Sequence, residues 1–477
     1  MSQVILSALA FLAVACTTAH ARNDAPGNHT GGDDSGIAED PDLANATLIP
    51  ELRRFLQGRN QLVKPTLEVV PPKAIAADIE FLKVMLPGSY GGYDASVQAG
   101  FSWDSAFATL SANTGQMSAQ DWQGHIASAL AGLQDQHLAI MRVRSDGGFE
   151  GWTSIAGRKA KRFELDPSCS SSSSVSAERH FADGAQELDR TVTYVGESAP
   201  ESTNCPWHEV ENPRRDRDRT PSVVALSDKV TLVHVHDFSS RDTAMWQTFK
   251  ATAASLRSAQ TIVIDLRGNT GGDDDQFYSW LVDLLGKRPK TIRFERLGTP
   301  WVQLNLVNYF TQQIAVHAGD DAWQQHVQQY RRSFLEQLAS VTAGTLSDRH
   351  WDIWDRANDA AAPTISSPFA GQMIALVDRR CASACELTVK TLRGLSNVTV
   401  IGENTYGMAV SGENGPKRLP GSGLALQWGQ WIETDLRDGF GGFHEGTGFL
   451  PDVWLAPGSA ESNETILALV AALERNQ

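Results

Sequence analysis

The sequence predicts an α/β protein of more than one domain, and three observations lead to this prediction. The chain has 477 residues, more than one compact core usually holds. From about residue 222 onward, apolar strands alternate with amphipathic helices, a pattern typical of a sheet whose faces are covered by helices. Before that region, residues 73–133 show helical periodicity, which predicts a separate helical domain.

The first 21 residues have the features of a signal peptide. The apolar run "VILSALAFLAVA" is too short to span a bilayer, and Ala19 and Ala21 supply small residues at the positions that precede a cleavage site. Lipid attachment at Cys16 is the less favoured alternative, because the residue three before that cysteine is alanine. We therefore expect an exported protein, periplasmic or secreted, with no transmembrane segment in the mature chain.

The net charge of −15 bears on the partners of the protein. Nucleic acids and anionic membranes both attract surfaces rich in Lys and Arg, so neither is expected as a partner. Residues 22–62 predict a flexible acidic leader, since their first half is rich in Gly, Asp, Asn and Pro.

Residues 63–145 predict the N-terminal helical domain. Helices are expected over residues 74–86, 102–110 and 118–133, the last with Ser118 as its N-cap. The segment "QDQHLAIMRV" follows, and its end predicts a strand. His137 lies directly before that strand; a lone histidine is more often structural or solvated than catalytic.

Residues 146–222 predict an inserted unit of uncertain fold, with one strand in "RTVTYVG". Four cysteines remain after signal cleavage, and in an oxidising compartment an even number suggests disulfides. Sequence order pairs Cys169 with Cys205 and Cys381 with Cys385. For the second pair, two free buried thiols remain an alternative.

The α/β core is expected in two parts, residues 223–299 and 359–477, separated by a helical insertion over residues 300–358. The expected strands cover 229–238, 261–269, 371–378, 398–404 and 424–434. The expected helices cover 243–259, 273–286, 383–395 and 463–476.

Ser383 lies where a strand turns into a helix. The motif "SACE" fits a capping box with Ser383 as N-cap and Glu386 at the third helical position, and a capping role alone would be common. However, a serine at this junction also points out of the carboxyl end of the sheet, beside helix N–H groups that stabilise an oxyanion. The position therefore also suits a nucleophile.

The segment "IDLRGNTGGDDD" follows another strand. Its glycines allow a sharp turn and expose backbone N–H groups that can converge on an anion. A phosphate site is disfavoured, because there is no GK[ST] and Asp273–Asp275 would repel phosphate. A carbonyl that gains charge only transiently suits this loop better, although a plain tight turn is also a common reading.

Four segments in this order resemble the C-terminal processing (tail-specific) serine peptidase family. They are "TIVIDLRGNTGG", "IALVDRRCASACE", "VIGENTYG" and "HEGTGFLPDVWL". The segment ending in "LQDQHLAI" resembles the end of that family's N-terminal region, which commonly has a leucine, an aspartate and then a histidine. The resemblance covers somewhat more than half of the chain. It implies a crotonase/ClpP-like catalytic core with Ser383 as the nucleophile, while a PDZ domain is not recognisable.

The resemblance also narrows the choice of the general base. One branch of the family uses a lysine in T-[YF]-G-K, but here "TYGMAV" places Met408 in that slot, and methionine cannot accept a proton. The other branch, which includes the tricorn core protease and resembles the repeats of interphotoreceptor retinoid-binding protein, uses a histidine and a glutamate. The matching residues are His137 and Glu445. Gln136 stands where the tricorn protease has a serine, so either Gln136 or Glu445 would orient His137.

The expected activity is peptide-bond hydrolysis through an acyl-enzyme, without a metal or other cofactor. His137 is the expected base, with His444 as the fallback. The oxyanion hole is expected from the N–H groups of Ala384 and of Gly271 or Gly272. The substrate would be a peptide or protein.

Three other readings stay open. A catalytically silent member of the fold could bind a peptide or an apolar ligand, as Met408 and Gln136 suggest. A metallohydrolase is disfavoured, because His234 and His236 share one strand face without a second ligand cluster in the sequence. A redox role of Cys381 and Cys385 is disfavoured by their CxxxC spacing.

Overall fold

A computed structural model describes most of the chain from residue 48 onward. The described residues are 48–52, 65–112, 115–133, 135–145, 149–154, 162–165, 174–177, 190–193, 207–210, 218–240, 242–289, 293–316, 321–355, 368–412, 416–455 and 460–475. The expected signal peptide, Cys16, most of the acidic leader, and Cys169 with Cys205 lie outside these residues. Among the described residues, the structure contains no helix with the length and apolar character needed to cross a bilayer.

The N-terminal helical region contains β1 (Val69–Val70), α4 (Pro72–Ser89), α5 (Tyr93–Gln98), α6 (Trp103–Ala112), β2 (Met117–Ser118) and α7 (Ala119–Ala129). The helices expected over residues 74–86, 102–110 and 118–133 are present as α4, α6 and α7, with α5 in addition. Ser118 caps α7 as predicted, because its Oγ accepts the N–H of Asp121 at 3.1 Å.

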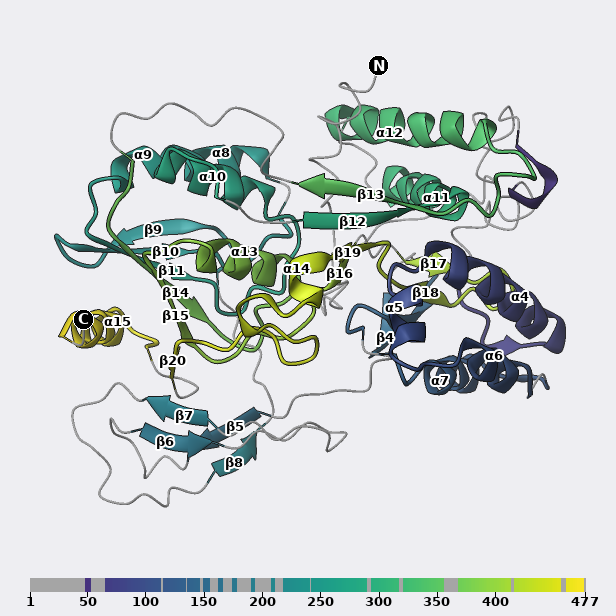
Figure 1. The fold of residues 1–477 in the computed structure, drawn as a ribbon, viewed down its shortest axis with the longest axis horizontal. Coiled ribbons are helices and arrows are strands. Elements are labelled where there is room, and N and C mark those ends of the chain that lie inside the picture. Colours follow the sequence, from purple (N-terminus) through teal and green to yellow (C-terminus); the bar gives the residue numbers. More distant parts are fainter. Residues whose placement is uncertain are drawn as a thin grey trace.

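A six-stranded sheet forms the centre of the catalytic core, at the left of Figure 1. Its order is β20-β15-β14-β11-β10-β9, and all pairs are parallel except β9 with β10. The strands are β9 (Ser222–Ala225), β10 (Val230–His234), β11 (Thr261–Asp265), β14 (Gln372–Val377), β15 (Val398–Gly402) and β20 (Val453–Trp454). The predicted α/β class is confirmed.

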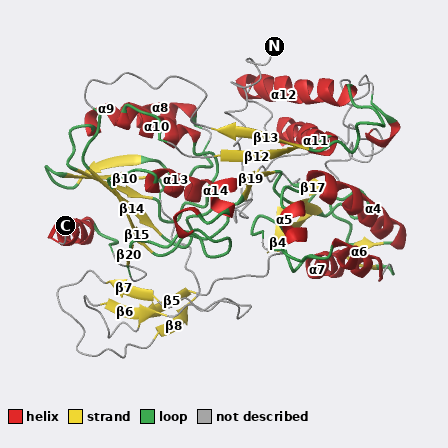
Figure 2. Ribbon diagram, in the orientation of Figure 1, coloured by secondary structure: helices red, strands yellow, loops and turns green. Residues whose placement is uncertain are grey.

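Helices cover both faces of this sheet, as Figures 1 and 2 show. One face packs on α8 (Thr243–Ala251), α9 (Ala253–Leu256), α10 (Asp275–Leu285) and α13 (Ala384–Arg393), and the other on α15 (Asn463–Arg475). Successive strand residues serve opposite faces: Ile262 and Ile264 join the first core, whereas Val263 joins the core with α15. The single helix expected over residues 243–259 is wrong; α8 ends before Thr252, whose hydroxyl bonds back to the carbonyl of Phe249 at 2.7 Å.

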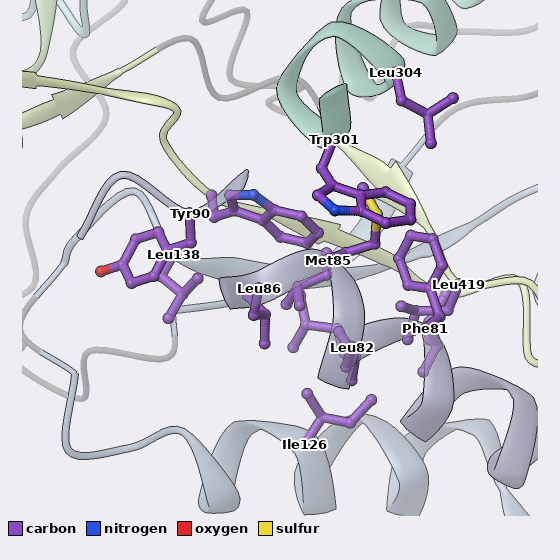
Figure 3. Packing of buried hydrophobic residues seen from close by; sticks show 14 of the residues in the cluster. Phe81, Leu82, Met85, Leu86, Tyr90, Ile126, Leu138, Trp301, Leu304 and Leu419 are labelled. Atoms are coloured by element: carbon purple, nitrogen blue, oxygen red, sulfur yellow. The ribbon is translucent and has the colours of Figure 1, made fainter. Parts of the chain in front are cut away.

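The helical insertion packs on the N-terminal helices. It contains α11 (Pro300–Val316), α12 (Asp321–Ala339) and a strand, β13 (His350–Asp355). Figure 3 shows Trp301 and Leu304 of α11 against Phe81 and Met85 of α4, within one buried cluster. The contact with α4 is close, because a Cβ added at Gly88 would lie 2.4 Å from Cδ1 of Trp301. The two segments therefore share one hydrophobic core.

Two four-stranded sheets join this helical part to the catalytic core. Their orders are β13-β12-β19-β16 and β17-β18-β3-β4. The further strands are β3 (Ala139–Val143), β4 (Phe149–Ser154), β12 (Arg293–Gly298), β16 (Ser411–Gly412), β17 (Lys417–Arg418), β18 (Ala425–Gln427) and β19 (Trp431–Glu433). The single strand expected over residues 424–434 is wrong, because the chain turns at Gly429, packs its backbone on Ser411 and enters the other sheet.

The inserted unit contains more strands than the one predicted. They are β5 (Arg162–Leu165), β6 (Ser174–Ala177), β7 (Arg190–Thr193) and β8 (Trp207–Val210), paired β5 with β8 and β6 with β7. After β19, the chain forms α14 (Thr434–Arg437) and the short η3 (Phe440–Gly442) before it returns to β20.

Candidate active site

Ser383 occupies the turn between β14 and α13, with a backbone conformation that is unusual for a side-chain-bearing residue. Its φ is +57° and its ψ −121°. Such a conformation costs free energy and persists only where the surroundings impose it, often at functional sites. Gly271 packs closely against this turn, since a Cβ atom added at Gly271 would lie 2.9 Å from Cβ of Ser383. The predicted N-cap position is confirmed, and the side chain remains partly exposed.

Glu386 holds the turn in place from inside the protein. Its buried carboxylate accepts the N–H groups of Ser383 (3.2 Å), Gly407 (2.7 Å) and Met408 (2.7 Å), and the hydroxyl of Thr405 (2.6 Å). Burial raises the pKa of Glu386 to about 7, although these hydrogen bonds oppose the shift. The capping box is present, and Glu386 also ties the "TYGM" loop to the nucleophile turn.

His137 faces Ser383 from the loop between α7 and β3. Its Nε2 lies 3.2 Å from Oγ of Ser383, although the two residues are 246 positions apart. The ring is fully buried, and this burial lowers the pKa of His137 to about 3. The imidazole is therefore neutral near pH 7, the form that can accept a proton from a serine hydroxyl.

Asp135 positions His137 and was missed by the sequence reasoning. Its Oδ1 accepts the N–H of His137 at 2.9 Å, and both oxygens accept the hydroxyl of Ser411, at 2.9 and 3.0 Å. Burial raises the pKa of Asp135, while hydrogen bonds including one from Tyr90 oppose the shift. The signal available in the sequence was the acidic residue of "LQDQHLAI", next to the histidine.

Glu445 lies beside His137 but binds backbone groups. Its Oε1 accepts the N–H of Gln136 at 3.1 Å, and its Oε2 accepts those of Ala409 at 3.3 Å and Val410 at 3.2 Å. A ring nitrogen of His137 and carboxylate oxygens of Asp135 and Glu445 lie within 4.8 Å of one another. Burial, and then the charge of Asp135, raise the pKa of Glu445 well above its usual range.

Gln136, the candidate relay, and His444, the fallback base, do not contact the catalytic atoms as expected. The buried side-chain amide of Gln136 and Nδ1 of His137 have no hydrogen-bond partner among the described residues, so the predicted amide relay is not formed. His444 is exposed, and no contact of its side chain with Ser383 is described. The fallback base is therefore not at the nucleophile in this structure.

Residues 229–454 match peptidase family S41. This confirms the predicted resemblance to the C-terminal processing peptidases and makes the catalytic core that of a peptidase. The matched region includes Ser383, Met408 and Glu445 but begins after His137. No curated protein matches the chain by sequence.

Several solved structures are similar to the chain. Mature CPAF is 15% identical with a TM-score of 0.49, and the match covers 85% of this chain and 98% of that one. The photosystem II D1 C-terminal processing protease is 13% identical with a TM-score of 0.38, over 82% and 96% of the chains. The tricorn protease is 14% identical with a TM-score of 0.37, over 84% of this chain and 36% of that one.

The glycine loop and the start of α13 offer two candidate N–H groups for an oxyanion hole. The N–H of Gly271 is already donated to Oδ1 of Asn269 at 2.9 Å, which excludes it as a free donor. No hydrogen bond from the N–H of Gly272 or Ala384 is described in the structure. Gly272 has φ +128°, and a Cβ there would lie 2.4 Å from the backbone of Phe238, so this position requires glycine.

A disulfide brackets the nucleophile. Cys381 and Cys385 are bonded, with their Cα atoms 5.2 Å apart, and both are fully buried. The predicted pairing is confirmed, and the alternative of two free thiols is wrong. The carbonyl of Cys381 also accepts the N–H of Tyr406 at 2.8 Å, which links the disulfide to the "TYGM" loop.

No described lysine replaces the missing base of the S41 lysine branch. Met408 is buried in the lysine position. Lys390, which is also buried, is bonded to Glu433 and Asp435, and Lys417 donates to the carbonyl of Trp428 at 2.6 Å. The group of Asp135, His137 and Glu445 has the composition of a metal site, but it contains a single imidazole, and burial raises the pKa of both carboxyl groups, which disfavours the ionised form that a metal needs. These residues fit a proton-transfer site better than a metal site.

Proposed function

We propose that the protein is a serine endopeptidase that hydrolyses peptide bonds through an acyl-enzyme on Ser383. The observation that carries the proposal is the distance of 3.2 Å between Oγ of Ser383 and Nε2 of a buried, neutral His137. A nucleophile and its base within hydrogen-bond reach are the shared requirement of serine hydrolases. The peptidase S41 match supports a peptide or protein as the substrate.

The reaction begins with attack of the Ser383 hydroxyl on the scissile carbonyl, while Nε2 of His137 takes the proton. The N–H groups of Gly272 and Ala384 receive the oxyanion, and losing one such donor typically costs about 3 kcal/mol of transition-state stabilisation. His137 then returns the proton to the leaving amine, and water releases the acyl group by the same route.

The imidazolium formed in these steps needs stabilisation by negative charge. The carboxyl groups of Asp135 and Glu445 lie within 4.8 Å of a ring nitrogen of His137. Burial raises the pKa of both, and an imidazolium beside them favours their ionised form by Coulomb attraction. In this mechanism, Asp135 additionally holds the backbone of His137, and Glu445 holds the loop from Ala409 to Val410 against the histidine.

Digestion of an unbiased peptide library, read by mass spectrometry, tests the proposal. Wild type is expected to cleave and Ser383→Ala to be inactive. The matched control is Ser111→Ala, which removes an exposed hydroxyl on α6 and should leave cleavage unchanged. Melting temperatures of all three proteins show whether they are folded. Cleavage by a folded Ser383→Ala protein at the wild-type rate would refute the role of Ser383.

A catalytically silent binding protein is the second candidate. It is favoured by the buried amide of Gln136 and by Nδ1 of His137, which have no described hydrogen-bond partner, and by Met408 in the lysine position. If this candidate is right, the library remains uncut by wild type, and peptides or apolar ligands are retained equally by wild type and by Ser383→Ala.

We also propose that the protein is exported. The small residues Ala19 and Ala21, the short apolar run before them and the oxidised pair Cys381–Cys385 support this localisation. Mass spectrometry of the purified mature protein should find Arg22 at its N-terminus. A lipid-modified N-terminus at Cys16 would instead support anchoring at the membrane surface.

A further inference from the structure

Two histidines and an aspartate meet at the ends of β10 and β11, outside the candidate active site. His234 ends β10 and lies in register with Asp265, the last residue of the parallel strand β11. His236 follows two positions later and faces the same carboxylate. In the sequence the two histidines have no further ligand nearby. The pairing of β10 with β11 brings Asp265 to them as a third ligand.

The distances within this cluster are those of a ligand set. Oδ2 of Asp265 lies 3.3 Å from Nε2 of His236 and 3.6 Å from Nδ1 of His234, and all three ligand atoms lie within 4.8 Å of one another. Bonds of about 2.0–2.1 Å to a tetrahedral zinc ion place neighbouring ligand atoms about 3.3–3.4 Å apart. Two of the three separations are thus already close to those around zinc.

The hydrogen bonding of His236 identifies which of its nitrogens is free. Nδ1 lies 3.1 Å from the backbone carbonyl of Asp218, and a carbonyl oxygen only accepts hydrogen bonds. In the neutral ring, Nδ1 therefore carries the proton, and Nε2 presents a lone pair to the carboxylate of Asp265. A histidine whose second nitrogen donates to a backbone carbonyl is the usual arrangement of a metal ligand.

Burial makes this arrangement costly unless a proton or a metal ion lies between the facing atoms. The side chain of His236 is only 8% exposed and that of Asp265 is fully buried, and Nε2 of His236 and Nδ1 of His234 both face Oδ2 of Asp265 without a hydrogen bond of good geometry. Buried acceptors that face one another without a hydrogen or a metal between them are destabilising. His234 is 27% exposed, which leaves a path from solvent.

Arg267 is the main competitor for Asp265. Its Nε and Nη2 each donate to one carboxylate oxygen at 2.7 Å, and its Nη1 lies 3.4 Å from Oε1 of Glu461. Each carboxylate oxygen has two lone pairs, so Oδ2 can bind Arg267 and a metal together. Glu461 and Asp378 also lie near Arg267 and share its positive charge with Asp265.

We propose that His234 Nδ1, His236 Nε2 and Asp265 Oδ2 form a zinc-binding site. Imidazole nitrogens with a carboxylate oxygen suit Zn²⁺ better than Mg²⁺ or Ca²⁺, which prefer oxygen ligands throughout. The ion would join the ends of β10 and β11 directly before the loop that carries Gly271 and Gly272. Water would take the fourth tetrahedral position through the exposed side of His234, and the proposal does not depend on peptidase activity.

The test is zinc and cobalt titration of the untagged, chelator-treated protein. Wild type should bind one equivalent of Zn²⁺ at this site, and Co²⁺ should give the intense visible bands of a tetrahedral site. His236→Ala should weaken binding by at least about 100-fold, more than the roughly 10- to 100-fold lost with an outer-shell partner. His234→Ala should also weaken it.

Two control variants complete the test. His350→Ala removes a histidine that is 63% exposed and also faces an aspartate, and binding should be unchanged. His137→Ala should keep the site, because its histidines are elsewhere. The proposal is overturned if folded wild type binds no zinc at about 0.1 mM, far above the Kd of structural zinc sites. It is equally overturned if binding survives both His234→Ala and His236→Ala, or is lost in His137→Ala alone.

Discussion

His137 and Ser383 lie in hydrogen-bond contact, Nε2 to Oγ at 3.2 Å, although they come from the N-terminal helical region and from the catalytic core. Replacing His137 with alanine should lower kcat/KM by at least about 10³-fold, since loss of the base from a serine–histidine pair disables the nucleophile. Initial rates on a peptide identified from the library measure this. His444→Ala is the control and should retain wild-type activity; the reverse result would assign the base to His444.

The buried environment of His137 predicts an unusual pH dependence of activity. With its pKa at about 3, His137 stays neutral at pH 5, where an ordinary imidazole of pKa about 6.5 would be about 97% protonated. Protonation of His137 should therefore not lower kcat/KM between pH 7 and pH 5, and any fall over this range should follow Glu386, whose pKa is about 7 and which holds the nucleophile turn. An acidic limb near pH 6.5 that persists unchanged in a folded Glu386→Gln protein would show that the base is not buried as described.

The lowered pKa of His137 also predicts how the free energy of unfolding changes with pH. Between pH 6.5 and about 3, the unfolded chain binds a proton at His137 that the folded protein does not, so the free energy of unfolding falls as the pH is lowered through this window. His137→Gln removes this contribution. The melting temperature of wild type should thus drop more steeply from pH 7 to pH 4 than that of the variant.

The disulfide between Cys381 and Cys385 should matter more for stability than for chemistry. A cross-link closing a loop of five residues contributes about 2 kcal/mol in the chain-entropy model. Replacing both cysteines with serine should lower the free energy of unfolding by about this amount and change kcat/KM by less than about tenfold. As a control, reductant is added to the double variant, because any change in its activity must then come from the other cysteines of the chain. Complete and reversible loss of activity on mild reduction of folded wild type would contradict this.

Asp135 should act by positioning His137. Asp135→Asn keeps the shape of the side chain but puts an amide N–H₂ opposite a donor, either the His137 N–H or the Ser411 hydroxyl. An unsatisfied buried donor costs about 1–3 kcal/mol, so both stability and kcat should fall while KM changes little. Ser411→Ala, which removes only the hydroxyl, should have the smaller effect. An Asp135→Asn enzyme with unchanged kcat would exclude the positioning role.

The contact between α4 and α11 should be important for folding. Trp301→Ala removes a buried ring from the shared core and should cost about 3–5 kcal/mol, seen as a lower urea midpoint. The matched control is Trp351→Ala, whose residue is 37% exposed on β13 and should change stability by about 0.5 kcal/mol at most. Equal effects of the two substitutions would show that α11 is not held in this core.

Much of the fold was predictable because its elements have local causes. The apolar runs of β10, β11, β14 and β15 and the amphipathic helices between them require a helix-covered sheet whatever their neighbours. Ser383 as a helix N-cap, Ser118 as another, and the pairing of Cys381 with Cys385 also follow from residues within a few positions of one another.

The errors arose where distant contacts override a local pattern. Residues 424–434 have the pattern of a single strand, yet the chain turns at Gly429, where Ser411 packs on its backbone. The segment before the turn, β18, pairs in one sheet, and the segment after it, β19, pairs in another. Gly271 was an expected oxyanion donor, but Asn269 uses its N–H. Asp135 accepts the hydroxyl of Ser411, which is 276 positions away, so nothing local in the sequence indicated this contact.

By itself, the sequence determined the α/β class, the peptidase S41 resemblance and the placement of Ser383 at a helix N-terminus. Only the tertiary structure decided that His137 reaches Ser383, that Asp135 supports it and that Asp265 joins His234 and His236. The physical reason is the same in each case. Backbone conformation and amphipathic pattern depend on neighbouring residues, whereas proton transfer and metal binding depend on atoms within about 3–4 Å, which packing brings together from distant segments.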